Sequence, residues 1–361
     1  MKKFALKVWS IFLGIHSAIF LRVSRKNLLC GPRLFYGGAR GGDVGGPLVK
    51  IAKLKKYFPQ KAFSFNLVYI LSNSIYLPKN TIEEIRSKSI PIVLNQNGVY
   101  FPAWYPGDYA AANSMMSYVH HNANYVFWQS KYCKRAAEKF LGARLGPGQI
   151  LYNAVDINKF YPGDCIPSDS FVFLMTGKIN RSSIYRFETA IRGLVYIRKS
   201  GFNAKICFAG WVQDIQLLNS IIQKYGVERY VDIFGPYTQD QAPQIYRQAN
   251  AYLSTTYMDS CPSAVLEALA SGLPIVHLDS GGTPELVGAF AGAGIAVPED
   301  WESIHIPSEE AIGYAMIKVF EGAKDMSGEA RARAEVHFNI EDWVLKHRDL
   351  FEFLINTKDL S

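Results

Sequence analysis

The chain of 361 residues is 49% apolar and 19% charged, which excludes a disordered polymer and allows about two domains of ordinary size. Its 39 lysines and arginines exceed its 31 aspartates and glutamates, and this basic balance favours anionic ligands without choosing among them. The five cysteines are scattered and form neither a CxxC pair nor a metal-ligand spacing, so we expect reduced thiols and no structural zinc.

The first 28 residues differ from the rest of the chain. Val8–Leu21 is an apolar run between Lys7 and Arg22, and it is shorter than the roughly 20 residues that a helix needs to cross a bilayer. Polar residues form one stripe of the predicted helix and aromatic residues cover much of the rest, which is typical of a helix in a membrane interface. A helix packed on the protein itself, a signal peptide and a spanning anchor remain alternatives. The stripe consists of Lys3, Lys7, Ser10, Gly14 and Ser17.

After residue 30 the hydrophobic pattern alternates between strands and helices. Short apolar runs bounded by glycine or polar residues predict strands, and apolar residues at every third or fourth position predict helices. Such alternation favours an α/β fold, with parallel strands covered by helices on both faces. The predicted strands lie at 32–38, 63–71, 90–98, 123–130 and 148–155, and the helices at 46–58, 115–122 and 131–142.

Residues 161–170, YPGDCIPSDS, interrupt the alternation with a composition typical of a linker. We therefore predict a helix at 1–28, a first Rossmann-like domain at 30–165 and a second at 166–337, with a C-terminal helix within 338–361 completing the first. The two domains are expected to face each other across a cleft, with ligands at the carboxyl ends of the strands. In the second domain, strands are predicted at 171–177, 204–210, 231–235, 251–255 and 274–278, and helices at 185–201, 215–226, 241–249 and 262–272.

The stretch from Asp259 to Val287, DSCPSAVLEALASGLPIVHLDSGGTPELV, contains the residues with the clearest chemistry. A helix is predicted to begin near Pro262, because proline is pre-organised for a first helical position, and Ser260 or Cys261 would be its cap. The free amide groups and the positive dipole end at such a helix start form an anion site.

Two acids, Asp259 and Glu267, are separated by seven residues and flank this predicted helix start. Carboxylates accept hydrogen bonds from hydroxyl groups and repel phosphate, so the arrangement suits a phosphate with a polyol on each side. A sugar nucleotide, with its ribose, diphosphate and sugar, is such a ligand.

The same stretch resembles the retaining glycosyltransferases of family four (glycosyl transferases group 1), whose fold is called GT-B. Their pattern has two acids separated by seven residues, then Ala-x-Ala-x-Gly-x-Pro and Gly-Gly-x-Pro-Glu, which are matched here by ALASGLP at 268–274 and GGTPE at 281–285. The similarity extends over most of residues 32–355. Other matching segments are ILYNAVDINKFYP at 150–162, FVFLMTGKINRSS at 171–183, YVDIFGPY at 230–237 and EDW…HRDLF at 341–351.

The resemblance implies roles for individual residues. Glu267 would bind the ribose hydroxyls, and Asp259, where the family usually has glutamate, would contact the transferred sugar. The amides at the helix start would bind the diphosphate, and the segment after the strand at 231–235 would border the base. The implied diphosphate contacts are Ser263, Ala264 and Val265, and the implied base contacts are Phe234, Gly235 and Tyr237.

The family also grips the diphosphate with two cations, and here the chain departs from the pattern. The family has Gly-Arg after the first strand of this domain and a lysine six positions later, whereas this chain has Lys178 and Ile184. Arg181 or Arg186 would take over, since the charge of the leaving group must still be stabilised. We favour Lys178 together with Arg181.

The first domain contains a glycine loop, GGARGGDVGG at 37–46, which resembles the family's loop between its first strand and helix. Gly41 and Gly42 are expected to let backbone amides approach a phosphate or sugar closely. The chain has neither GxGxxG nor GxxxxGK[ST], so a Walker-type nucleotide site is not expected. Where the family often has a histidine, the chain has Asn95, Gln96 and Asn97, and we expect His120 and His121 on a solvated or core face.

The resemblance thus implies a retaining glycosyltransferase, and because no DxD pair for a metal occurs, we expect it to be metal-independent. The expected partners are a nucleotide-sugar donor and a glycan or lipid-linked acceptor of cell-envelope synthesis, with no cofactor and no nucleic acid. A donor phosphate oxygen takes the acceptor proton in the family's mechanism. Peripheral contact with the inner face of the cytoplasmic membrane is expected through residues 4–26. The alternatives are a GT-B-like nucleotide-sugar epimerase and a two-lobed sugar-binding protein without catalysis.

Overall fold

The structure is a computed structural model that describes residues 2–21, 31–42, 46–62, 64–163 and 170–357. Contacts divide the chain into two compact units: unit 1 comprises Met1–Tyr152 and Asp342–Ser361, and unit 2 comprises Asn153–Glu341. Most of the linker predicted at 161–170 lies outside the described residues. The residues just before it already pair within unit 2, because Val155 accepts a hydrogen bond from the Ile340 amide (3.0 Å) and donates to the Phe338 carbonyl (2.8 Å).

Unit 1 contains a parallel sheet in the order β1-β2-β3-β4-β5. An isolated parallel bridge joins Leu34 to Gln60, so the chain first touches the outer side of β1 before it forms β2 on the inner side. The winding direction therefore reverses at β1. The strands are β1 (Leu34–Phe35), β2 (Leu67–Leu71), β3 (Ile92–Gln96), β4 (Tyr125–Trp128) and β5 (Gly148–Ile150).

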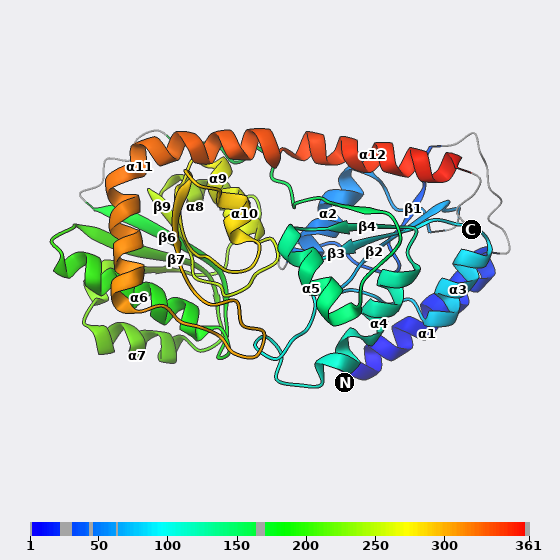
Figure 1. Cartoon of the computed structure of the whole chain (residues 1–361), viewed down its shortest axis with the longest axis horizontal. Helices are drawn as coiled ribbons and strands as arrows, with labels where there is room; N and C mark the ends of the chain where they lie inside the picture. The colour runs from blue at the N-terminus through cyan, green and yellow to red at the C-terminus, as the bar shows by residue number, and fades with distance from the viewer. Residues whose placement is uncertain (1, 22–30, 43–45, 63, 164–169, 358–361) are drawn as a thin grey trace. The chain divides into compact units, whose positions relative to one another are not determined.

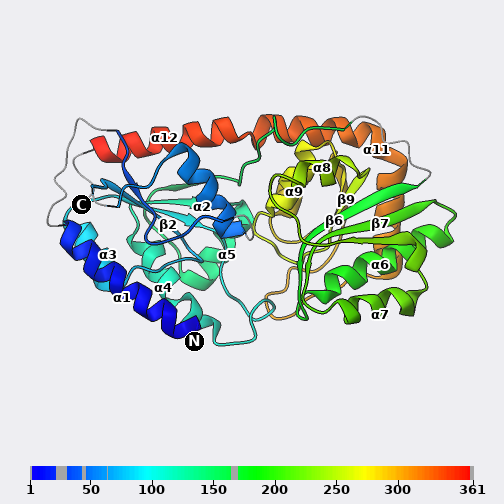
Figure 2. The ribbon, with the colours of Figure 1, turned by 180° about the vertical axis from the view of Figure 1, so that it is seen from behind.

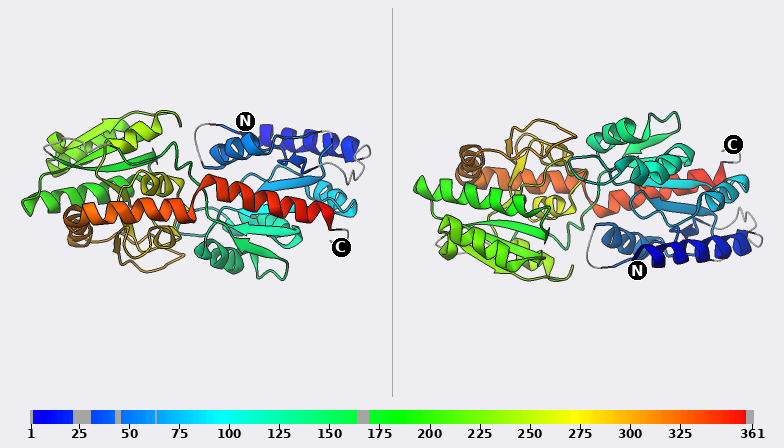
Figure 3. Two further views of the ribbon diagram at one scale, coloured as in Figure 1. Left: turned by 90° about the horizontal axis from the view of Figure 1, so that it is seen from above. Right: turned by 90° about the horizontal axis from the view of Figure 1, so that it is seen from below.

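Helices cover both faces of this sheet, as predicted from the alternating pattern (Figures 1 and 2). One face packs its aliphatic side chains against α3, α4 and α5. The other face lies against α2 and α12, where Tyr69 and Phe127 meet His347 and Phe351 in an aromatic cluster. Figure 3 shows α12, in red, extending along the sheet. The helices are α1 (Lys2–Leu21), α2 (Gly46–Tyr57), α3 (Lys79–Ser87), α4 (Tyr109–Asn122), α5 (Lys131–Leu141) and α12 (Ile340–Asn356).

The N-terminal helix α1 packs on unit 1 through one side only. Leu13 is buried in the core cluster with Leu77 and Ile82, and the guanidinium of Arg40 lies 4.8 Å from the ring centre of Trp9. No helix among the described residues is long and apolar enough to span a bilayer. The rest of the helix predicted at 1–28 lies outside the described residues. The side of α1 away from the core exposes Leu6, Val8, Ile11, Phe12 and Ile15.

Unit 2 contains a second parallel sheet, in the order β11-β10-β9-β6-β7-β8. The chain builds outward from β6 through β7 to β8, then returns to form β9 on the other side of β6, so the winding reverses between β6 and β9. Figures 1 and 2 show α6 and α7 on one face and α8 and α9 on the other. The strands are β6 (Phe171–Ile179), β7 (Ala204–Val212), β8 (Val231–Phe234), β9 (Ala251–Ser254), β10 (Ile275–Leu278) and β11 (Gly292–Ile295).

The helices of unit 2 begin and end at residues with clear local causes. Asp214 caps α7 by accepting a hydrogen bond from the Leu217 amide (3.0 Å), and Gly226 ends it in the left-handed conformation that glycine adopts without strain. Ser308 likewise caps α11 through the Ala311 amide. The helices are α6 (Ile184–Lys199), α7 (Ile215–Tyr225), α8 (Ala242–Arg247), α9 (Ser263–Ala270), α10 (Thr283–Val287) and α11 (Glu309–His337), with a 3-10 turn at Glu228–Tyr230.

The long helix α11 was not among the predicted elements. It packs against both α6 and α9 with a narrow apolar strip, in which Ile312, Met316 and Val319 are followed by the small residues Ala330 and Ala334. Two small alanines give a weak periodic signal, because a helix of this kind is mostly polar around its circumference. The helix predicted over 338–355 is confirmed as α12.

Candidate functional site

The reversal of winding in unit 2 brings two loops together. β6 pairs with β9 through Phe173–Ala251 and Leu174–Tyr252, so the loops that follow these strands emerge side by side at the carboxyl edge of the sheet. Ligands of open α/β sheets bind at such a point. Lys178 lies near the end of β6 and Arg181 lies in the loop after it, and the loop after β9 carries Asp259.

Helix α9 begins one residue later than expected. Pro262 is itself the cap, with φ −67° and ψ 115°, and no side chain caps the helix, so the prediction of Ser260 or Cys261 as the cap is wrong. The extended conformation of Pro262 turns the chain into the helix without a side-chain acceptor. Asp259 instead accepts a hydrogen bond from the Cys261 amide (3.2 Å), which closes the loop upstream of the helix.

The amides at the start of α9 differ in their availability. The Val265 amide donates to the Pro262 carbonyl (3.1 Å), and the Val265 side chain is buried. Ser263 and Ala264 are half-buried, and their amides have no hydrogen-bond acceptor among the described residues outside the helix itself. The positive end of the helix is therefore presented by the amides of Ser263 and Ala264.

Glu267 lies in the second turn of α9 and is buried, with 5% of its surface exposed. The hydroxyl of Tyr246 donates to its Oε2 at 3.0 Å, and the same hydroxyl lies 3.2 Å from Thr176 Oγ1. Burial, and secondly the negative charge of Glu267, raise the pKa of Tyr237 and of Tyr246, so both phenols stay protonated. The hydrogen bond from the Tyr246 hydroxyl thus helps to fix the position of the carboxyl group.

Asp259 lies in a loop with an uncommon backbone. Met258 has φ 53°, a left-handed conformation that is strained for a non-glycine residue and is concentrated at functional sites. The Gly282 amide donates to the Asp259 carbonyl (2.7 Å), and a Cβ at Gly281 would lie 2.4 Å from that carbonyl oxygen. Gly281, the first glycine of the GGTPE segment, is therefore required for its close approach to the Asp259 loop.

Burial raises the pKa of Asp259, and the Cys261 amide and the positive charge of Arg186 oppose this rise. Arg186 comes from the first turn of α6, where its Nη1 donates to the Lys178 carbonyl at 3.5 Å. Its Nε is buried without a hydrogen-bond partner among the described residues. A guanidinium with a spare donor thus lies close enough to influence Asp259.

The two cations favoured from the sequence lie differently. Arg181 is 78% exposed at its side chain and pairs with Asp214 at 3.2 Å, which draws its charge toward the start of α7. Lys178 is exposed at the end of β6. Side-chain direction at this turn could not be read from spacing, because a turn without helical or strand period places no residue on a known face.

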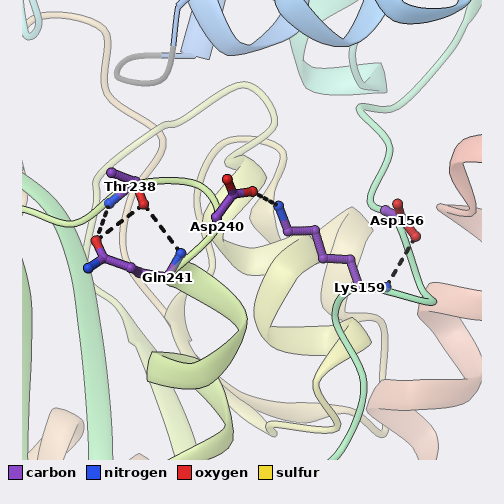
Figure 4. A network of polar contacts seen from close by, with 5 residues as sticks. All are labelled: Asp156, Lys159, Thr238, Asp240 and Gln241. Atoms are coloured by element: carbon purple, nitrogen blue, oxygen red, sulfur yellow. Dashed lines mark hydrogen bonds and ion pairs between the residues drawn. The ribbon is translucent and has the colours of Figure 1, made fainter.

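The segment expected to border the base follows β8. Phe234 and Gly235 are exposed and Tyr237 is half-buried. Figure 4 shows how the next residues are held: Thr238 and Gln241 bind each other reciprocally, with the Thr238 amide 2.9 Å from Gln241 Oε1. Lys159 reaches Asp240 at 2.8 Å, which lowers the pKa of that carboxyl. The anchors of this segment are Asp156, Lys159, Thr238, Asp240 and Gln241.

Asn153 is a residue of this site that the sequence did not single out. Its Nδ2 donates to the Cys261 carbonyl at 2.8 Å, and its backbone amide lies 3.3 Å from Cys261 Sγ. It therefore holds the loop between Asp259 and Pro262 through Cys261. Its place within the family-like segment 150–162 was the available signal.

In unit 1, the glycine loop and the histidines have structural contacts. Gly41 packs against α2, where an added Cβ would lie 3.1 Å from Ala52 Cα, and the Gly42 amide donates to the Leu48 carbonyl at 3.1 Å. His120 is buried, and burial lowers its pKa to about 4. His121 lies 2.8 Å from the Leu141 carbonyl. Among the described residues, no three His, Cys, Asp or Glu side chains gather as metal ligands would.

Comparisons with known proteins agree with this arrangement. Residues 164–312 match the family model described as glycosyl transferases group 1. The chain has no match among curated proteins.

Many solved structures resemble the chain, among them the following three. Sucrose-phosphate synthase from Thermosynechococcus elongatus superposes with a TM-score of 0.65 at 15% identity, over 90% of this chain and 99% of that one. HepE from Anabaena, in complex with UDP and glucose, gives a TM-score of 0.63 at 16% identity, over 85% and 82%. A glycosyltransferase from Rickettsia africae gives 0.63 at 14% identity, over 86% and 80%. The chain thus has the GT-B fold, and most of its second unit matches the glycosyl transferases group 1.

Proposed function

We propose that this protein is a retaining glycosyltransferase that moves a sugar from a nucleotide-diphosphate sugar to a glycan or lipid-linked acceptor. One observation carries the proposal: Asp259 and the buried Glu267 flank the open amides of Ser263 and Ala264, at the point where the sheet of unit 2 reverses its winding. This order of acceptor, donor and acceptor groups matches the order of sugar, diphosphate and ribose. The family match over residues 164–312, and the UDP and glucose bound by HepE, support it.

In the proposed reaction, Glu267 accepts hydrogen bonds from the ribose hydroxyls and Asp259 from the sugar. The amides of Ser263 and Ala264 and the guanidinium of Arg186 stabilise the charge that develops on the departing diphosphate. A phosphate oxygen of the donor accepts the proton of the acceptor hydroxyl as the new glycosidic bond forms on the same face. The spare Nε donor of Arg186 is the reason to prefer this residue to Arg181, whose charge is paired with Asp214.

The proposed function predicts that one class of nucleotide sugar stabilises the folded protein. A screen of UDP-, GDP- and ADP-sugars by thermal shift is expected to give one stabilising base, because a ligand that binds only the folded state raises the melting temperature. Release of the nucleotide diphosphate in the presence of acceptor extracts would then establish transfer. NMR of the product would show whether its anomeric configuration is retained.

The transfer assay also tests metal independence, and the binding screen tests the alternative function of sugar binding without catalysis. We expect transfer to persist in EDTA, since protein cations and a helix end replace the metal. Loss of activity in EDTA that Mg²⁺ or Mn²⁺ restores would refute metal independence. Donor binding without transfer or hydrolysis would favour the sugar-binding alternative, and no binding of any nucleotide sugar would refute the proposal itself.

We also propose that α1 attaches the enzyme to an anionic membrane surface, as the inner face of a cytoplasmic membrane presents. Its core side is occupied by Leu13, while the other side exposes a row of large apolar residues beside the exposed cations Lys7 and Arg40. Apolar burial and attraction to anionic lipid both strengthen such interfacial binding. This location suits a lipid-linked acceptor.

Flotation with vesicles is the measurement for this attachment. Phe12→Ser with Ile15→Ser is expected to reduce binding to phosphatidylglycerol vesicles severalfold, because both side chains are more than half exposed and their change leaves the core intact. Phe290→Ser, which changes a still more exposed aromatic residue of unit 2, is the control. Equal flotation of the double variant and the control would remove the membrane role of α1.

A further inference from the structure

Three buried hydroxyl groups form a chain of hydrogen bonds that ends at the carboxylate of Glu267. Thr176, from β6, has its Oγ1 2.9 Å from the hydroxyl of Tyr252, from β9, and 3.2 Å from the hydroxyl of Tyr246, from α8. The Tyr246 hydroxyl in turn donates to Glu267 Oε2 at 3.0 Å. Each of the three hydroxyl-bearing residues is at most 2% exposed. The chain of hydroxyl groups therefore lies inside unit 2 and connects two strands and α8 to α9.

The carboxylate fixes the direction of each hydrogen bond in this chain of hydroxyl groups. A hydroxyl group has one proton to donate, whereas an ionised carboxylate only accepts. Because Tyr246 donates its proton to Glu267, it accepts from Thr176, and Thr176 then accepts from Tyr252. Burial is the largest cause that raises the pKa of Tyr246 and of Tyr252, so both phenols keep the proton that this order requires. All three hydroxyl groups thus donate in the direction of Glu267.

The packing of this part of the core does not require the hydroxyl groups. The ring of Tyr246 lies edge-on to Phe160, with ring centres 5.6 Å apart, and nearly parallel to the ring of Tyr252 at 5.9 Å. Phenylalanine would keep both ring contacts, and valine has nearly the shape of threonine. Burial of a hydroxyl group costs free energy unless it is hydrogen-bonded. What the three hydroxyl groups add to the core is a fixed donor for one carboxylate, and that carboxylate is the group to which we assign the ribose.

We propose that Tyr246 and Thr176 are positioning residues of the donor site, which hold Glu267 in the orientation that recognises the ribose hydroxyls. This inference rests on the proposed function, in which Glu267 binds the ribose. A carboxylate has about four lone-pair positions, so it can accept from Tyr246 and from ribose hydroxyls at the same time. A carboxylate that is already fixed at one oxygen loses less rotational freedom when the ligand binds, and preorganisation of this kind increases affinity.

The test compares nucleoside diphosphates with and without ribose hydroxyls by calorimetric titration of the full chain. UDP, GDP and ADP are titrated beside their 2′,3′-dideoxy counterparts. For the base that binds, the unchanged protein is expected to prefer the ribonucleotide by about 10- to 100-fold, the range of a hydrogen bond to a charged group. Tyr246→Phe is expected to lower this preference by about threefold or more. The ribonucleotide loses affinity and the dideoxynucleotide does not, because only the ribonucleotide uses the fixed carboxylate.

Thr176 is tested by rescue and by a double variant. Thr176→Val is expected to lower the preference for the ribonucleotide less than Tyr246→Phe does, because Tyr246 keeps its bond to Glu267 and loses only its own donor. Thr176→Ser keeps the hydroxyl group and is expected to restore the preference of the unchanged protein. Since Thr176 acts through Tyr246, the double variant Tyr246→Phe with Thr176→Val is expected to match Tyr246→Phe alone. The Thr176 variants also provide the test if Tyr246→Phe does not fold.

Tyr225→Phe is the matched control, because the Tyr225 hydroxyl also donates to a carboxylate of unit 2, that of Glu188 at 3.0 Å. This control is expected to leave the preference for the ribonucleotide unchanged. An unchanged preference in Tyr246→Phe and Thr176→Val, or an equal loss of affinity for both nucleotides, would overturn the proposal and leave the hydroxyl groups a role in core packing alone. A failure of the proposed function gives a different result: the unchanged protein would then bind no nucleoside diphosphate, or would bind it without preference for the ribonucleotide.

Discussion

Glu267→Gln is expected to weaken binding of the nucleotide-sugar donor by about 10- to 100-fold, because hydrogen bonds to a charged carboxylate contribute about 1.5–3 kcal/mol. Glutamine keeps the shape of the side chain, and its amide oxygen can still accept the hydrogen bond of the Tyr246 hydroxyl. The variant therefore changes charge while the buried packing of α9 is retained. Glu267→Ala is a harsher change, since it also leaves the Tyr246 hydroxyl without this partner.

Calorimetric titration with the donor found in the screen is the measurement. Glu188→Gln is a matched control: its carboxylate also accepts a tyrosine hydroxyl, that of Tyr225 at 3.0 Å, but on the side of α6 facing α7. The control is expected to bind donor like the unchanged protein. Unaltered donor affinity in Glu267→Gln and Glu267→Ala would contradict the role of Glu267 in binding the ribose. It would also contradict the interpretation of Asp259 and Glu267 as ligands of a sugar nucleotide.

Arg186→Met is expected to lower kcat by about 10²–10³, the loss seen when one preorganised donor to developing negative charge is removed. The guanidinium influences Asp259 and has a buried Nε without a partner among the described residues, so it has a donor to give to the diphosphate. Arg181→Met is expected to change kcat less than threefold, because Arg181 is exposed and paired with Asp214. Arg186→Lys should recover part of the rate through its charge.

Steady-state release of the nucleotide diphosphate measures both variants under the same conditions. The outcome that reverses the assignment is a large loss in Arg181→Met with little change in Arg186→Met. That result would return the diphosphate contact to Lys178 and Arg181, the pair that we favour from the sequence, where the chain departs from the family pattern.

Much of the fold could be predicted because the hydrophobic periodicity of its strands and helices is strong. The strands of unit 2 are short apolar runs bounded by glycine, proline or polar residues, and each predicted strand there is present. Boundaries were less certain. α4 begins at Tyr109 rather than Met115 because the Asp108 side chain accepts a hydrogen bond from the Ala111 amide at 2.9 Å, a capping contact outside the apolar pattern.

Only part of the candidate site could be predicted from sequence patterns. The acids and the start of α9 were identified because a fixed motif names them in sequence. The Asn153 contact with Cys261 joins positions far apart in the chain, so it has no local signature. The free donor of Arg186, in the first turn of α6, depends on how other segments pack around its side chain, which helical periodicity alone does not encode.

The place of α12 has a consequence for synthesis on the ribosome. Unit 1 begins the chain but closes only with His347, Phe351 and Leu354, which are buried in its core at the far end of the sequence. Domains fold as units while the chain emerges, so unit 2 has its complete sequence before unit 1 does. Until α12 has been synthesised, Tyr69 and Phe127 lack their covering helix. A nonsense codon shortly before α12 would spare every residue of the donor site and still leave an aggregation-prone, unfinished first half.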